Sequence, residues 1–109
     1  MKFYYNGQLV RTSKTHQYKY ALINTETGKC YACGADRKNP EAELRYRSAN
    51  LVTYRAVRDG QYRQKDKYHC TAEQIRKNAE KYYGSLENAI AEQEEYVANL
   101  KIVELEARA

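Results

Sequence analysis

Alternating hydrophobic and polar positions predict β-structure in the first third of the chain. The stretch KFYYNGQLVRTS, residues 2–13, has two β-prone runs on either side of Asn6-Gly7, a pair typical of the two-residue type I′ hairpin turn. Such a turn determines which residues face each other across the hairpin. The expected pairs are Phe3 with Val10, Tyr4 with Leu9, and Lys2 with Arg11. Because directly opposed like charges are unfavourable, either Lys2 and Arg11 splay into water or an anion lies between them.

The alternation continues beyond this hairpin. In YKYALIN, Tyr18, Tyr20 and Leu22 fall on one face of a strand, and Ala21 and Ile23 fall on the other. NTETG has the composition of a turn, and KCYACGA is a further strand. We therefore predict four N-terminal strands in an antiparallel meander.

The pattern then changes to the 3.6-residue spacing of a helix. We predict this helix over residues 40–58, with Asn39 as its cap and Pro40 at the first helical position. Asp59-Gly60 follows its end. Arginines border its apolar stripe, where their stems can pack while their charged heads reach a cleft or another chain.

A second helical pattern begins after Thr71-Ala72-Glu73-Gln74, which matches a capping box. Gly84-Ser85 could end one helix and cap another, yet the apolar spacing runs through this pair without a break. We therefore favour one long helix over residues 72–100. KIVELEA, residues 101–107, is rich in β-branched residues and predicts a short closing strand. The expectation is a single α+β domain, residues 1–109, with a β-meander followed by two long helices.

The high tyrosine content of the chain is typical of proteins with binding surfaces. The chain has twelve Tyr, one Phe and no Trp. Tyrosine is favoured at partly solvated sites such as interfaces and ligand clefts, because its ring is apolar and its hydroxyl is polar. In this chain it can also serve simply as the core aromatic residue. A chain of 109 residues has a thin stability margin. We therefore expect a homo-oligomer with the long helix in its interface.

The net charge of +5 is unevenly distributed. Residues 45–67 hold seven Lys and Arg against two Asp, whereas residues 86–106 hold six Glu against one Lys. This asymmetry can steer anionic ligands or pair protomers head to tail. The alternative is that the basic and the acidic segment are ordinary solvent-exposed surfaces without a binding role, which would have the same numbers of charged residues.

Targeting signals and cysteine usage indicate the compartment. No apolar run follows Lys2, and nothing approaches the roughly 20 apolar residues of a membrane span. Three cysteines is an odd number, which argues against a disulfide framework. We predict a reduced, cytoplasmic protein without membrane association.

The CYACG stretch, containing Cys30 and Cys33, has the form of half a zinc site. Zinc needs four ligands, and only His16, His69 and Cys70 remain to complete the set. Because adjacent His69 and Cys70 rarely bind one ion together, we predict that the chain holds no metal. Cys30 and Cys33 would then be small residues on a strand.

Catalytic patterns have little support. Cys70 lies beside His69, but neighbouring positions seldom aim at each other and no third orienting group is evident. Glu92, Glu94 and Glu95 fit a solvated helix face, and no glycine-rich phosphate loop is present. We expect a protein that is not an enzyme and uses no cofactor.

Basic and aromatic residues of the middle segment suit a nucleotide ligand. Arginine recognises phosphate oxygens with two parallel hydrogen bonds, and tyrosine rings stack on bases. The predicted ligand-binding residues are Arg11, Arg47, Tyr54, Arg55, Arg58, Tyr62, Arg63, Lys65 and Tyr68. The alternative is a basic helix end and loop that only increase solubility.

The opening YYNGQLVRTS…YKYALIN resembles the starts of small phage proteins. The order of elements, a sheet followed by two long helices, is similar to the Thoeris anti-defence sponge family of bacteriophages. This resemblance implies a protein of the host bacterial cytoplasm that sequesters cyclic ADP-ribose or a cyclic oligonucleotide without cleaving it. It also implies assembly through the helices, and it assigns no binding residue.

Two other functions fit the same residues. One is a phage or mobile-element protein that binds nucleic acid, or that inhibits a nucleic-acid-handling host defence complex by protein contact, like an anti-CRISPR protein. The basic segment argues against DNA mimicry, which needs an acidic surface. The other is a zinc-bearing interaction module.

Overall fold

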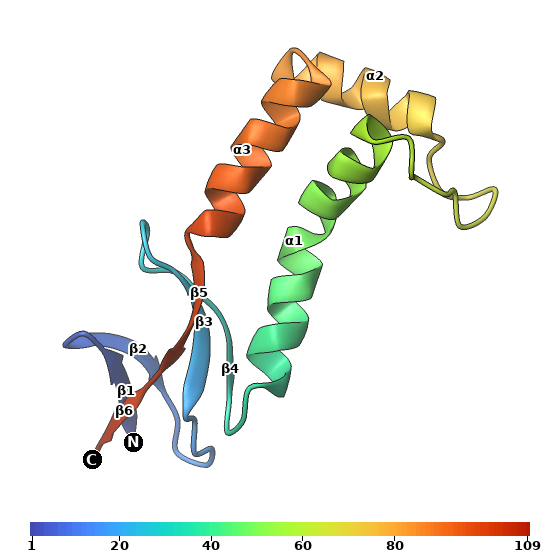
Figure 1. Cartoon of the computed structure of the whole chain (residues 1–109). Coiled ribbons are helices and arrows are strands. Elements are labelled where there is room, and N and C mark those ends of the chain that lie inside the picture. The colour runs from blue at the N-terminus through green and yellow to red at the C-terminus, as the bar shows by residue number, and fades with distance from the viewer. The chain divides into compact units, whose positions relative to one another are not determined.

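The computed structural model describes all residues, Met1–Ala109, and divides into two compact units. The strand unit comprises Met1–Arg47 and Ala98–Ala109, and the helical unit comprises Ser48–Val97. Figure 1 shows the elements of both units. The chain is α+β, with antiparallel strands near both termini and helices between them.

Six strands form two three-stranded sheets. Their bounds are β1 Lys2–Tyr5, β2 Gln8–Thr12, β3 Tyr20–Asn24, β4 Cys30–Gly34, β5 Leu100–Glu104 and β6 Glu106–Arg108. The sheet orders are β2-β1-β6 and β4-β3-β5, and every pairing is antiparallel. The predicted C-terminal strand is confirmed, and it continues after Leu105 into a second short strand.

The four predicted N-terminal strands are present and pair antiparallel, but as two hairpins rather than one continuous meander, because β2 and β3 do not pair. The segment between them turns on itself, since the Ser13 hydroxyl accepts hydrogen bonds from the amides of Thr15 and His16. The free edge of β3 pairs instead with β5, and the free edge of β1 pairs with β6. Strands from the end of the chain therefore complete both N-terminal hairpins.

The first hairpin has the predicted turn and a different register. Asn6 and Gly7 both have positive φ, 49° and 78°, as a type I′ turn requires. Tyr4 faces Leu9 as predicted, but Phe3 faces Arg11 and Lys2 faces Thr12. A bulge between Phe3 and Tyr4 causes this shift by leaving Val10 as the extra residue. The expected pairing of Lys2 with Arg11 is therefore not formed.

Both hairpins contribute to the core of the strand unit. Phe3 and Ala21 are fully buried, and Ile23, Val103 and Leu105 are nearly so. The Tyr18 ring meets Phe3 edge-on, with 5.3 Å between ring centroids.

Three helices are present where two were predicted. Helix α1 spans Lys38–Arg58, α2 spans Ala72–Tyr83 and α3 spans Leu86–Ala98. Helix α1 ends where predicted but begins two residues before Pro40, because the Asp36 carboxylate accepts a hydrogen bond from the Lys38 amide. No helix combines the length and the apolarity that a membrane crossing requires.

The prediction of one helix over residues 72–100 is wrong. Gly84 has a φ of 91°, in the left-handed region, and its amide bonds back to the Glu80 carbonyl. The Ser85 hydroxyl then accepts a hydrogen bond from the Asn88 amide and starts α3. The predicted capping box is confirmed, with Thr71 and Gln74 exchanging both of its hydrogen bonds.

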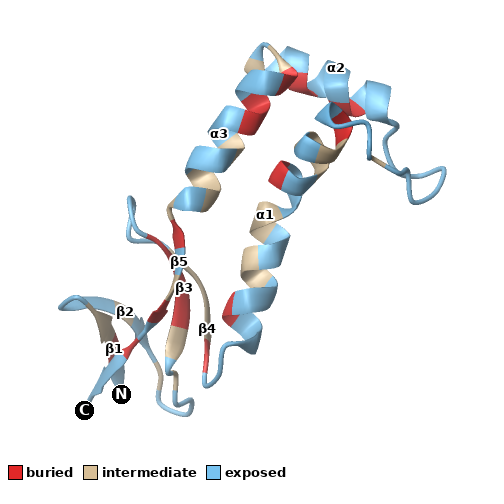
Figure 2. Cartoon of the chain, viewed as in Figure 1, coloured by how far each residue is buried: buried red, intermediate tan, exposed pale blue.

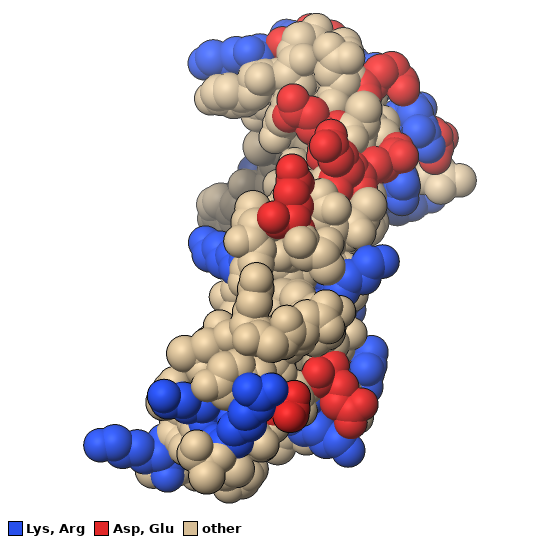
Figure 3. Space-filling view, turned by 90° about the vertical axis from the view of Figure 1, so that its left-hand side faces the viewer, with Lys and Arg blue, Asp and Glu red and all other residues tan.

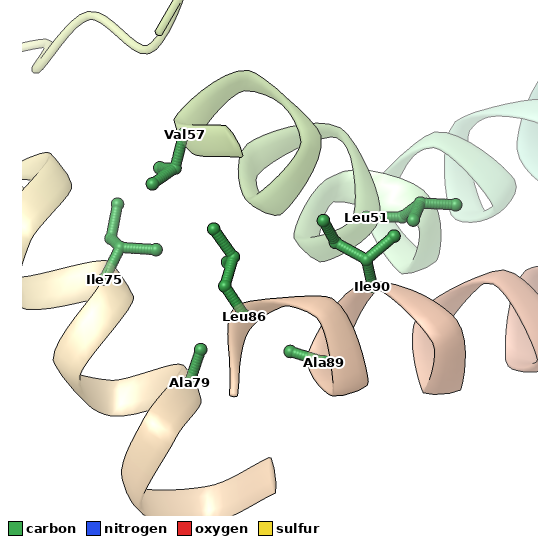
Figure 4. Close-up of a cluster of buried hydrophobic side chains, with 7 residues drawn as sticks. All are labelled: Leu51, Val57, Ile75, Ala79, Leu86, Ala89 and Ile90. Atoms are coloured by element: carbon green, nitrogen blue, oxygen red, sulfur yellow. The ribbon is translucent and has the colours of Figure 1, made fainter. Parts of the chain in front are cut away.

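The break at Gly84 lets α3 turn away from α2 and run beside α1, so that the three helices enclose a core (Figure 4). All three helices contribute buried side chains, shown converging in Figure 4: Leu51, Val57, Ile75, Ala79, Leu86, Ala89 and Ile90. In Figure 2 the buried positions are confined to parts of each helix, and most of the remaining helical surface is exposed. An unbroken helix would carry Leu86 and Ile90 away from Ile75 and Ala79. Burial of these apolar groups therefore favours the break.

Candidate functional site

The basic loop, residues 59–70, joins α1 to α2 and extends away from the helices of its unit (Figure 1). Its own polar groups brace it from within. The Tyr62 hydroxyl donates to the Cys70 carbonyl at 2.6 Å, which ties the two ends of the loop. The Gln64 side-chain amide donates to the carbonyls of Asp66 and His69, both at 2.8 Å. A loop braced in this way has less conformational freedom to lose when a ligand binds.

Asp66 is the centre of a tight turn in this loop. Its Oδ1 accepts hydrogen bonds from the Tyr68 amide at 2.8 Å, the His69 amide at 3.2 Å and the His69 ring at 2.8 Å. The hydrogen bond with the His69 ring, together with those from the backbone, lowers the pKa of Asp66. This carboxylate is therefore ionised and held within the loop, where its charge offsets part of the positive charge of the lysines on either side of it.

The outer surface of the basic loop carries cations and an exposed ring. The Tyr68 side chain is 85% exposed, and the Lys67 ammonium lies 5.2 Å from its ring centroid. Arg63 and Lys65 are exposed, and neither is among the ion-paired residues. Four of the nine predicted binding residues lie on this loop, and three of them, Arg63, Lys65 and Tyr68, are exposed.

Two predicted tyrosines support the helical core. Tyr54 and Tyr62 are partly buried against it, and Tyr54 meets Tyr83 edge-on with 6.2 Å between ring centroids. Burial raises the pKa of the Tyr54 hydroxyl. A base could reach these rings only at their exposed edges, so Tyr68 is the better platform for stacking.

Two predicted arginines already hold carboxylates. Arg55 lies 3.6 Å from Glu94 of α3, and Arg58 bonds Asp59 at 2.9 and 3.4 Å. The bonds with Asp59 raise the pKa of the Arg58 guanidinium. Figure 3 shows acidic side chains gathered on one face of the helical unit, over α3. A phosphate at Arg55 or Arg58 would have to displace these exposed, weakly held partners.

The remaining two predicted residues, Arg47 and Arg11, belong to the strand unit. The Arg47 Nε lies 2.9 Å from a Glu43 carboxylate oxygen, and its guanidinium lies 3.9 Å from the Tyr31 ring centroid. Arg11 lies over the Tyr18 ring at 5.7 Å and beside the Cys30 and Cys33 thiols.

The net positive charge of the chain belongs to the strand unit. This unit has eleven Lys and Arg against six Asp and Glu, whereas the helical unit has eight of each. Counting charged residues in continuous segments of the sequence did not reveal this distribution, because the strand unit is assembled from both ends of the chain. The basic character of residues 45–67 is offset within the helical unit by the acids of α2 and α3.

Two hollows lie away from the basic loop, and the second of them includes one predicted residue, Tyr54. One of about 370 Å³ in the strand unit is lined by residues of two turns, among them Asn6, Gln8 and Thr25, and by no charged side chain. A smaller one of about 120 Å³ in the helical unit lies beside Tyr54, where Asn50 and Asn78 contribute amides. Neither could be found by sequence pattern, because each joins residues far apart in the chain.

A metal site would need several ligands close together. No group of three or more His, Cys, Asp and Glu side chains lies close enough to hold an ion. The absence of a bound metal in the protein itself stays a prediction. Comparison with known proteins yields no matching family model, no matching curated protein and no matching solved structure.

Proposed function

We propose that the chain binds a nucleotide-type anion through the basic loop and sequesters it without cleaving it. The observation that carries this proposal is the outer surface of the loop, where Arg63, Lys65 and Lys67 are exposed and the Lys67 ammonium lies 5.2 Å from the centroid of the exposed Tyr68 ring. None of these three cations forms an ion pair, and the Asp66 carboxylate between the lysines is hydrogen-bonded to groups of its own turn.

The chemistry of these side chains matches the two parts of a nucleotide. An arginine fork bonds two phosphate oxygens, and lysine adds a point charge. A tyrosine ring gives a base a stacking surface worth about 1–3 kcal/mol. The ligand class is therefore a compact phosphate ester that carries a base, and cyclic ADP-ribose and cyclic oligonucleotides belong to this class.

Sequestration gives this binding a biological role. The resemblance to phage anti-defence sponges motivates a role in host bacterial cytoplasm, where a captured signalling nucleotide could no longer activate immunity. Assembly into a homo-oligomer through the helices would raise the number of basic loops in each particle. A sponge needs affinity and slow release but no chemical step.

Nucleic acid is the second candidate ligand. The observation that favours it is the excess of cations on the strand unit, because a long polyanion can contact many separate charges at once. The two ligand classes differ in their response to salt. Affinity for a polyanion falls steeply with salt, in proportion to the phosphates neutralised, whereas a ligand held by two or three cations responds weakly.

Calorimetry distinguishes these possibilities. Cyclic ADP-ribose isomers, cyclic dinucleotides and a single-stranded oligonucleotide are titrated into the protein at low and at moderate salt. The proposal predicts heat from a small ligand, with a shallow salt dependence and with intact ligand recovered after heating. Binding of the oligonucleotide alone, lost at moderate salt, would replace the proposal with the second candidate.

A further inference from the structure

A β-bulge places the thiols of Cys30 and Cys33 on one face of β4. Residues three apart on a regular strand point to opposite faces. Here Ile23 faces Cys30 and Leu22 faces Ala32, which leaves Tyr31 as the extra residue. Cys30 and Cys33 are consequently opposite Ile23 and Ala21, which share a face. Their Sγ atoms lie 3.4 Å apart.

The surroundings of this dithiol are half-buried and positively charged. Both cysteines pack against the strand-unit core, and both keep intermediate exposure, so a small reagent can reach them. Arg11 of β2 extends beside both thiols, and Tyr18, whose ring lies next to Arg11, is the other titratable neighbour. A lone guanidinium in this position stabilises a thiolate and repels metal cations.

The two thiols differ in acidity. The two sulfurs share one hydrogen bond, in which either can be the donor, and this bond, supported by Arg11, lowers the pKa of Cys30 to about 6. The same bond raises the pKa of Cys33. The pair therefore shares one proton near neutral pH, and the lowered pKa of Cys30 favours it as the attacking sulfur. An attacking sulfur beside a protonated resolving sulfur is the arrangement that thiol–disulfide exchange requires.

We propose that Cys30 and Cys33 form a thiol–disulfide exchange site for small anionic disulfides, with Cys30 attacking and Cys33 resolving. The Cys30 thiolate attacks one sulfur of the disulfide, forms a mixed disulfide and expels the first thiolate, which takes a proton from water. Cys33 then gives up its proton to water and attacks the Cys30 sulfur, expelling the second thiolate, which takes a proton from water in turn. The protein dithiol is oxidised by two electrons to a Cys30–Cys33 disulfide, and the small disulfide is reduced to two thiols.

Charge determines the preferred partner. Arg11 beside the dithiol and the excess of cations on the strand unit favour a disulfide that carries carboxylates, such as glutathione disulfide. Cystamine, a disulfide of similar reactivity with two ammonium groups, should react more slowly. This site lies in the strand unit, so the inference does not depend on nucleotide binding by the basic loop.

The test uses the full chain with Cys70→Ser, which removes the exposed third thiol. Reduced protein is incubated with glutathione disulfide and analysed by mass spectrometry. We expect the loss of two hydrogens and an internal disulfide. Adding Cys33→Ser should stop the reaction at one glutathione on Cys30, whereas adding Cys30→Ser should leave the protein almost unreacted. Equal trapping in the two variants, or no reaction, would overturn the proposal.

The pH profile provides a second readout. The alkylation rate of the Cys70→Ser protein should rise with a midpoint near pH 6. At pH 6, the larger thiolate fraction outweighs the lower nucleophilicity, and the folded protein should react about twentyfold faster than its urea-unfolded form. Arg11→Gln should raise the midpoint and abolish the preference for glutathione disulfide over cystamine, and Arg11→Lys should largely restore both. A midpoint near the ordinary thiol value of 9.0 in the folded protein would contradict the mechanism.

Discussion

Replacing Gly84 with alanine tests the break between α2 and α3. Gly84 has a φ of 91°, and a Cβ added there would lie 3.3 Å from the Asn88 side-chain nitrogen. A left-handed conformation costs a residue with a Cβ about 1–2 kcal/mol. The reduced freedom of the unfolded chain offsets about 0.4–1 kcal/mol of this. Displacing Asn88 also weakens its 3.1 Å bond to the Tyr83 carbonyl. We expect Gly84→Ala to lower the free energy of unfolding by about 1 kcal/mol.

The assay is urea unfolding followed by circular dichroism, with Gly84→Asn as the control. Asparagine adopts left-handed φ more readily than alanine, so the broken helix predicts the stability order Gly, then Asn, then Ala. A continuous helix predicts that alanine is the most stable of the three, because its helix propensity exceeds that of both others. A stabilised Gly84→Ala protein with higher helicity would refute the left-handed cap.

Three further predictions concern the helical unit. Ile90→Ala should lower the free energy of unfolding by about 2–5 kcal/mol because it opens a cavity among buried side chains, whereas Val52→Ala on the exposed side of α1 should change it by less than about 0.5 kcal/mol. Thr71→Ala should cost about 1 kcal/mol in the same urea assay, because the capping box loses one of its hydrogen bonds. Because the pKa of Asp66 in the folded chain lies below its ordinary value of 3.8, its contribution to loop order is complete above that pH and is lost as the pH falls through the lower value. The amide chemical shifts of Tyr68 and His69 should follow this titration, and a midpoint above 3.8 would contradict the hydrogen bonding of Asp66.

Local signals predicted the features that depend on a few neighbouring residues. Asn6-Gly7 forms its turn, and Thr71 and Gln74 form their capping box, because the groups that determine each structure lie within four residues. Gly84 was harder to interpret. The apolar spacing is the same on both sides of it, and only the core that α3 shares with α1 and α2 shows that the helix breaks there.

Long-range contacts account for what the sequence did not show. The partners of β1 and β3 are β6 and β5, from the other end of the chain, and no local pattern identifies them. The contacts of the candidate site likewise depend on residues far apart in the sequence, which local patterns do not reveal. The composition of residues 59–70 indicated a basic, aromatic loop, but the pairing of Arg55 with Glu94 depends on α3. The shared face of Cys30 and Cys33 depends on a bulge that periodicity does not predict.

A matched pair of tyrosine variants tests nucleotide binding by the basic loop most directly. Tyr68 and Tyr82 are both exposed, and each has a lysine ammonium near its ring, at 5.2 and 5.4 Å. Tyr82 lies on α2, outside the loop. A nucleotide that binds the unmodified chain is titrated into each variant in a calorimeter. Tyr68→Ala should weaken its binding by about 1–3 kcal/mol, while Tyr82→Ala should leave the binding free energy unchanged. Equal affinities for the two variants, or no heat from any nucleotide with the unmodified chain, would contradict the account.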